Sequence, residues 1–194
     1  HTMGKRKRAA SPSVRCIKPT IDRNKYPKCF HTTLIKSLFS LRLEPHWVLP
    51  NGNCFYLALA DQLKRKKIWN NPQEFKTITN ANKVRENVIL NIQHHRKLCG
   101  MFNAIFPNQL HAYIRTHLKD KTFTGDDDII MLSAATLYNV TINVFYESNR
   151  GVSHLKYHPA DIADSSLQLP QLYMCLINQH YWSTKNYNYN LLSV

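Results

Sequence analysis

A cysteine stands between an asparagine- and glycine-rich turn and an apolar helical pattern, in the stretch LPNGNCFYLALADQL. The Asn-Gly-Asn triplet is typical of a tight turn, because glycine has no Cβ and asparagine side chains hydrogen-bond to nearby backbone. Phe55, Leu59 and Leu63 then recur at helical spacing, which predicts a helix from about Cys54 to Lys67 with its first two turns buried. The pattern therefore places Cys54 at the N-terminus of a buried helix.

A thiol at a helix N-terminus has a chemical use, because the exposed N–H groups and the helix dipole favour the thiolate. We therefore expect the pKa of Cys54 to be lowered. Successive N–H groups of a turn can converge on a developing oxyanion, so Asn51, Gly52 and Asn53 are predicted to form an oxyanion loop. These residues are the ingredients of an acyl-transfer site with a cysteine nucleophile.

Such a thiol needs a base, and one of the ten histidines is well placed for that role. His180 lies in LINQHYWSTK, at the end of an apolar strand pattern and next to aromatic residues. A strand end can present a side chain rigidly toward a facing helix, so His180 is the candidate base. The other nine histidines lie at the N-terminus, on polar helix faces or beside prolines, where surface or capping roles are the simpler interpretation.

Helical periodicity precedes strand periodicity along the chain. Besides the helix after Cys54, helices are predicted at about 31–44, 81–97, 107–119 and 126–138, with a Gly-Met-Phe loop at 100–102. Period-two alternation then predicts strands in VTINVFYES, GVSHLKYH and LYMCLIN. Helices followed by strands are typical of an α+β fold, here with an antiparallel or mixed sheet.

Composition fits one globular domain, with 43% apolar and 11% aromatic residues in a chain of 194. We expect residues 1–28 to comprise a tag remnant, His1 and Thr2, followed by a flexible basic arm, and residues 29–194 to form a single catalytic domain. No apolar run is long enough for a membrane span, and no signal-peptide pattern follows the basic residues. Without heptads, a monomer is expected.

The five cysteines are odd in number and lack C-x-x-C spacing, which indicates a reducing, intracellular setting rather than a disulfide framework. The nearest approach to a metal cluster is His94, His95 and Cys99, but no second ligand pair accompanies it. A polar helix end is the simpler interpretation of these three residues. No metal and no cofactor are predicted.

The net charge of +14 is concentrated in the first hundred residues and favours an anionic partner. Its densest run, Lys5-Arg6-Lys7-Arg8, suits a nuclear-localisation or phosphate-binding patch, and equally a solvated tail. Few aromatic residues are interleaved with the basic ones, and no nucleic-acid-binding module is recognised. Specific nucleic-acid binding is therefore not expected.

Three segments resemble landmarks of the ovarian tumour (OTU) family of cysteine deubiquitinases. NGNCFYLALA resembles the Asp-Gly-Asn-Cys signature, GDDDIIMLSAATLYNVTINVFYE resembles the Gly-Asp-containing helix and Ile-x-Val strand, and HYWS resembles the closing His-Tyr motif. They occur in the family's order. The resemblance implies an α+β, papain-type cysteine protease fold, with a small central mixed or antiparallel sheet between helical lobes. It also implies hydrolysis of the isopeptide bond after the C-terminal glycine of ubiquitin or a ubiquitin-like modifier.

Within that resemblance, Cys54 would be the nucleophile and His180 the general base and acid. The sequence departs from the family at Asn51, where Asp is usual, and at Trp182, where an Asp or Asn usually orients the histidine. Three interpretations remain open: a dyad without an orienting group, an orienting group from elsewhere, or an inactive relative kept for binding. The residues that could supply an orienting group are Asp22, Asn24, Asn178 and Asn186.

The intact cysteine, turn and histidine favour an active deubiquitinase acting on ubiquitin or polyubiquitin. The alternatives are a weak or inactive ubiquitin-binding module and a protease of the same fold that processes a viral polyprotein. Asp126, Asp127 and Asp128, with Trp182, are candidates for holding the basic tail of ubiquitin, although the acidic group also suits a helix cap. The small basic chain favours a virus or intracellular bacterium, acting in the cytoplasm or nucleus of a host cell.

Overall fold

The structure, a computed structural model, describes residues 32–69, 71–119, 128–162 and 168–187. Within these ranges five strands form one sheet in the order β1-β5-β4-β2-β3. Neighbouring strands are antiparallel except β2 and β4, which are parallel. The strands are β1 (Leu43–His46), β2 (Thr141–Ser148), β3 (Gly151–Tyr157), β4 (Gln171–Ile177) and β5 (His180–Asn186). The prediction of an α+β fold with a small mixed sheet is confirmed.

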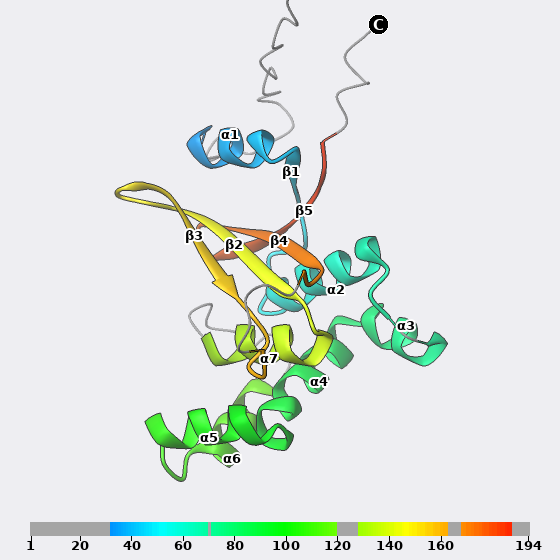
Figure 1. Cartoon of the computed structure of the whole chain (residues 1–194), viewed down its shortest axis with the longest axis vertical. Helices are drawn as coiled ribbons and strands as arrows, with labels where there is room; N and C mark the ends of the chain where they lie inside the picture. The colour runs from blue at the N-terminus through cyan, green and yellow to red at the C-terminus, as the bar shows by residue number, and fades with distance from the viewer. Residues whose placement is uncertain (1–31, 70, 120–127, 163–167, 188–194) are drawn as a thin grey trace, which may run out of the picture.

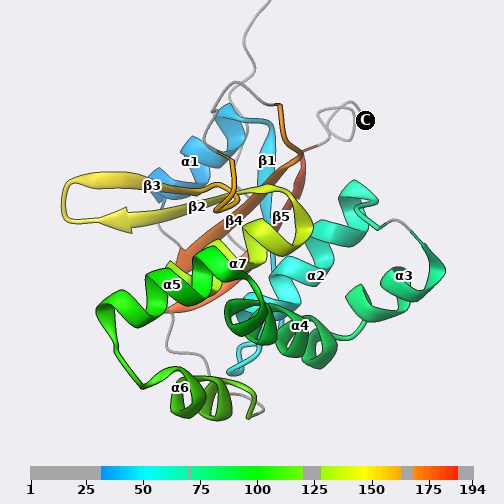
Figure 2. The same cartoon turned by 60° about the horizontal axis from the view of Figure 1, so that its bottom comes forward.

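Helices cover both faces of this sheet. Figure 1 shows α1 on one face, with α2 and the group α4 to α7 on the other; Figure 2 shows the same arrangement from below. The helices are α1 (Thr32–Ser40), α2 (Cys54–Lys66), α3 (Pro72–Ile78), α4 (Ala81–His94), α5 (Arg96–Ile105), α6 (Leu110–His117) and α7 (Asp128–Tyr138). The sheet is therefore the middle of three layers.

Each face of the sheet has its own apolar core. The larger core joins α2, α4 and α7 to the sheet, and the smaller core joins α1 to the opposite face. Because strand side chains alternate between faces, Tyr181 belongs to the larger core and Trp182 to the smaller one. The two residues that follow His180 therefore pack on opposite faces of the sheet.

Three predicted helix boundaries are wrong, and one of them is the start of the helix expected over 107–119, which begins at Leu110 rather than at Pro107. The helix expected over 31–44 ends at Ser40, because Arg42 has φ 58° and the chain then forms β1 against β5. The helix expected over 81–97 ends at His94, since His95 is extended and accepts a hydrogen bond from the Leu98 N–H at its own Nδ1. That cap starts α5, which contains the segment expected to be a Gly-Met-Phe loop.

The helix over 72–78 has no counterpart among the predictions. Its N-terminus is nevertheless well formed, because the Asn71 side chain accepts hydrogen bonds from the backbone of Gln73 and Glu74, with Pro72 in the first turn. The helices at Cys54 and at Asp128 and the three predicted strands are confirmed. The predicted tag remnant and basic arm, residues 1–28, lie outside the described residues.

None of the helices in the described ranges is long and apolar enough to cross a lipid bilayer.

Candidate active site

The turn before α2 is held by the side chain and carbonyl of Asn51. The Asn53 N–H donates to Asn51 Oδ1 over 2.9 Å, and the Cys54 N–H donates to the Asn51 carbonyl over 2.9 Å. The Asn53 side chain extends the turn to α4, where its Nδ2 donates to Asn82 Oδ1 over 3.1 Å. The two asparagines therefore hold the turn as predicted, and an amide at position 51 is sufficient to do so.

Cys54 is the first residue of α2 and is 6% exposed. Its thiol is hydrogen-bonded by the backbone of Tyr181, at the start of β5, and by the backbone of Phe55. The rings of Phe55 and Tyr181 also pack edge to face, with centroids 5.4 Å apart. Because Tyr181 directly follows His180, the fold brings the two predicted catalytic segments together across 126 positions of sequence.

A tight hairpin places His180 at the start of β5. The loop between β4 and β5 has only Asn178 and Gln179, with φ of 50° and 62°, and Ile177 pairs directly with His180. Two residues of positive φ are what a type I′ hairpin requires. The hairpin therefore fixes the backbone of His180, and its ring packs edge to face against Trp182 with centroids 5.8 Å apart.

Within the described residues, the group that hydrogen-bonds the His180 ring is a backbone carbonyl. Its Nε2 lies 3.0 Å from the carbonyl oxygen of Val48, in the segment that leads into the cysteine turn. A carbonyl can only accept, so Nε2 carries the proton and Nδ1 keeps the lone pair that a base needs. Sequence reasoning missed this partner because a main-chain carbonyl has no residue type to recognise.

Neither Asn178 nor Asn186 replaces the Val48 carbonyl as the partner of His180 Nε2 in the described residues. Asp22 and Asn24 lie outside them. Asn178 occupies the hairpin turn, and Asn186 lies at the other end of β5, opposite Leu43. Of the three open interpretations, the geometry favours an orienting group from elsewhere, upstream of the cysteine.

Trp182 is a core residue, which corrects its interpretation as a contact for the ubiquitin tail. Its side chain is 7% exposed and packs with Leu34 and Leu38 of α1 in the smaller core. A buried indole on the α1 face cannot offer a surface to a peptide. The tryptophan instead packs edge to face against the His180 ring.

The expected lowering of the Cys54 pKa is wrong. Burial raises the pKa of the Cys54 thiol, and hydrogen bonds from the backbone of Tyr181 and Phe55, with the positive charge of Arg85, only partly oppose it. Burial also lowers the pKa of His180, against a smaller raising effect of the Val48 carbonyl. Near pH 7 the resting pair is therefore a thiol and a neutral imidazole.

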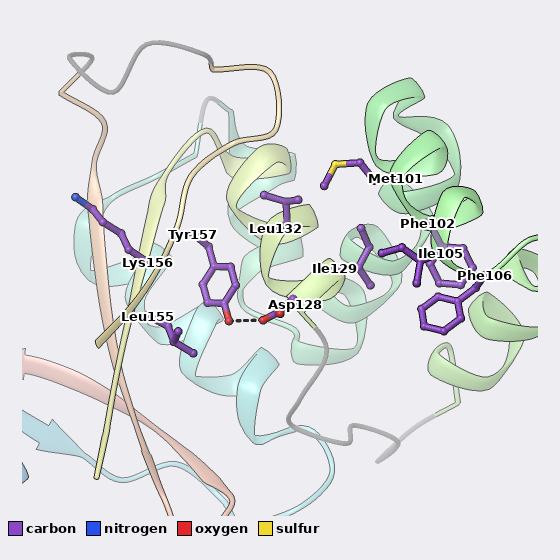
Figure 3. A pocket seen from close by; sticks show the side chains of 10 residues that line it. All are labelled: Met101, Phe102, Ile105, Phe106, Asp128, Ile129, Leu132, Leu155, Lys156 and Tyr157. Atoms are coloured by element: carbon purple, nitrogen blue, oxygen red, sulfur yellow. Dashed lines mark hydrogen bonds between the residues drawn. The ribbon is translucent and has the colours of Figure 1, made fainter. Parts of the chain in front are cut away.

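An apolar pocket of about 330 Å³ lies between α5, α7 and β3. Figure 3 shows Ile105, the last residue of α5, and Phe106, directly after it, on one side and Leu155 of β3 on the other. At its rim the Tyr157 hydroxyl donates to Asp128 Oδ1 over 2.6 Å. Asp128 is thus engaged at the start of α7, whereas Asp126 and Asp127 lie outside the described residues.

The His94, His95 and Cys99 group does not form a ligand set. His95 caps α5 through Nδ1 and pairs with Asp161 Oδ2 over 2.7 Å through Nε2. The Cys99 sulfur accepts a hydrogen bond from Asn103. No group of three metal-ligating side chains is found in the part of the chain that the structure describes.

No protein-family model matches this sequence, and no curated protein matches it. Solved structures do resemble it. The OTU domain of OTUD1 is 17% identical with a TM-score of 0.61, over 79% of this chain and 92% of that one. The Hazara virus OTU bound to ubiquitin is 15% identical with a TM-score of 0.52, over 75% of this chain and 82% of that one.

An OTU deubiquitinase from Wolbachia pipientis wMel bound to ubiquitin is 14% identical with a TM-score of 0.52, over 76% of this chain and 98% of that one. At these identities the likeness concerns the fold. The chain has the fold of OTU domains, which confirms the fold that the three sequence segments implied.

Proposed function

We propose that this chain is a cysteine-type deubiquitinase that hydrolyses the isopeptide bond after the C-terminal glycine of ubiquitin or a ubiquitin-like modifier. The observation that carries the proposal is the contact between the first turn of α2 and the start of β5, where the Phe55 and Tyr181 rings pack together and the Tyr181 backbone hydrogen-bonds the Cys54 thiol, one residue after His180. The presence of ubiquitin in two of the similar structures supports the choice of substrate.

In the proposed mechanism the Cys54 sulfur attacks the carbonyl carbon while His180 Nδ1 takes the thiol proton. The resulting imidazolium is stabilised by its Nε2–H bond to the Val48 carbonyl. His180 then gives the proton to the lysine amine as the C–N bond breaks, which leaves a thioester on Cys54. Water, deprotonated by His180, hydrolyses the thioester and restores the thiol.

The oxyanion is proposed to lie against the backbone from Asn51 to Cys54. The N–H groups of Asn53 and Cys54 already donate to Asn51, so an oxyanion there would be their second acceptor. The shape of such a turn is fixed before the substrate binds. Its N–H groups therefore need little reorganisation as negative charge develops on the carbonyl oxygen of the substrate.

The first test is the reaction of the chain with a ubiquitin probe that carries an electrophile at its C-terminus, followed by intact-mass measurement. We expect one covalent adduct on the native chain and on Cys99→Ala, and none on Cys54→Ala. Cys99 is a matched control because it is a free cysteine that is more exposed than Cys54.

If the folded native chain gave no adduct while still binding ubiquitin, the enzyme would be excluded in favour of a binding module. The binding module is the second candidate because Trp182 stands where an acid or amide is usual. We also propose that the protein acts inside a host cell. The free thiols of Cys54, Cys99 and Cys175 suit a reducing intracellular setting.

The apolar pocket is the proposed contact for the body of ubiquitin, with the acidic start of α7 beside it for the basic tail. Ile105 is 70% exposed, and Met101, Phe106 and Leu155 around it are also exposed. Apolar side chains gathered at a hollow in this way are typical of an interaction site.

Replacing Ile105 with aspartate is expected to raise KM for a ubiquitin substrate about tenfold and leave kcat within about twofold, because the change removes apolar contact without touching the catalytic groups. The matched control is Phe75→Asp, an exposed apolar residue of α3 outside the pocket. Equal KM for both variants, measured by steady-state hydrolysis, would contradict the assignment of the pocket.

A further inference from the structure

Arg85 is a buried cation that contacts the turn before the predicted nucleophile. It lies on α4, and only 2% of its surface is exposed. One terminal nitrogen, Nη2, donates to the Gly52 carbonyl over 2.6 Å and also to Asn53 Oδ1. Both acceptors belong to the turn that precedes Cys54.

The other end of the same guanidinium contacts a different segment. Its Nη1 donates to the carbonyls of His117, over 3.2 Å, and Lys119, over 2.7 Å, at and just beyond the C-terminal end of α6. The guanidinium carbon also lies 4.6 Å from the centroid of the ring of Tyr56, which belongs to the first turn of α2. Helix carbonyls of this kind carry the negative end of the dipole and suit a cation.

This geometry needs a planar, forked donor. A guanidinium presents several N–H groups in fixed directions and can bond two segments at once, whereas an ammonium is a point charge on a flexible stem. The Gly52 carbonyl is held on the Arg85 side of the turn, which sets the orientation of the peptide leading into Asn53. Asn82, on the same helix, holds the Asn53 side chain from the other end.

We infer that Arg85 is a positioning residue, which ties the cysteine turn to the C-terminal end of α6 and so holds Asn53 and Cys54 in the arrangement that attack requires. The inference rests on the proposed function. It assigns Arg85 no contact with substrate, since its hydrogen bonds go to the turn and to the carbonyls at the end of α6. Its positive charge also favours the Cys54 thiolate.

The experiment compares Arg85→Lys, Arg85→Met and Lys83→Met with the native chain of 194 residues. Lys83 is the matched control because it is an exposed cation on the same helix, paired with Glu86. Thermal unfolding establishes that each variant is folded. The first readout is steady-state hydrolysis of a ubiquitin substrate, and the second is the rate of Cys54 alkylation by iodoacetamide as a function of pH, followed by peptide mass.

We expect Arg85→Lys, which keeps the charge but loses the fork, to lower kcat at least tenfold with KM changed less than threefold. Arg85→Met should lower kcat at least as much and shift the Cys54 alkylation profile to higher pH. A folded Arg85→Lys variant with native kcat would overturn the inference. So would an alkylation profile that moves as much in Lys83→Met as in Arg85→Met.

The alkylation readout needs no ubiquitin. If the native chain did not cleave any ubiquitin substrate, the proposed function would fail, and the Cys54 profiles would still report on Arg85. Native kcat in a folded Arg85→Lys variant, beside an active native enzyme, would instead reject the positioning role alone. The two failures are therefore distinguishable.

Discussion

Replacing His180 with glutamine is expected to lower kcat/KM for a ubiquitin-derived amide substrate by about 10³-fold at pH 7.5. Burial raises the pKa of the Cys54 thiol, so without a base only the small ionised fraction can attack. Glutamine keeps much of the size of the ring and a hydrogen-bond donor for the Val48 carbonyl, but it cannot take the proton. The loss therefore measures proton transfer rather than collapse of the site.

The pH profile makes this prediction specific to His180. A histidine whose pKa is lowered by burial stays a neutral base below the ordinary value of 6.5. The native rate should therefore hold through pH 6.5 and fall only as the pH drops further. In His180→Gln this acid limb should disappear, and the residual rate should rise with pH as the thiol ionises.

His94→Gln serves as the control for the His180 variant, because His94 is an exposed histidine at the end of α4. It should keep the native rate and profile. If His180→Gln kept the native rate and the native acid limb, as His94→Gln is expected to do, His180 would not be the base.

Features with local sequence signals were predicted correctly. The turn at Asn51 and the helix at Cys54 follow from side chains within a few residues of each other. The end of α7 at Asn139, with φ 50°, is a similar case. Their determinants are capping and periodicity, which a single sequence displays directly.

Features that depend on tertiary contact were missed. The sequence predicts a helix over strand β1 because Leu41 continues the stripe of Leu34 and Leu38 and the first helix-breaking residue after it is Pro45. Only pairing with β5 makes this segment extended. The Val48 carbonyl lies against His180 because of the fold. A backbone carbonyl is present in every residue type, so the sequence does not indicate this contact. The pKa of Cys54 is a third case, since the helix N-terminus can be read from sequence but burial cannot. Burial is the larger effect, so the expected direction was wrong.

A buried glutamine supports the contact between α2 and the strands behind the site. The ladder between β4 and β5 ends at Met174 and Ser183, and just beyond it Gln62 bridges the two strands. Its Oε1 accepts from the Tyr173 N–H over 3.1 Å, and its Nε2 donates to the Thr184 carbonyl over 2.6 Å. Thr184 faces Pro45 of β1, which has no N–H to donate.

Replacing Gln62 with leucine is expected to lower the free energy of unfolding by about 2 to 5 kcal/mol, because a buried N–H and a buried C=O each lose a partner. Leucine has a similar size, so the loss reports on hydrogen bonding more than on packing. Chemical denaturation followed by circular dichroism measures it. Gln73→Leu, on the exposed side of α3, should stay within about 0.5 kcal/mol of the native chain. Equal stability of the two variants would mean that the ends of β4 and β5 are held without the glutamine. The start of β5, and with it His180, would then be positioned by the hairpin at Asn178, by the pairing of β5 with β4 and by the Val48 carbonyl.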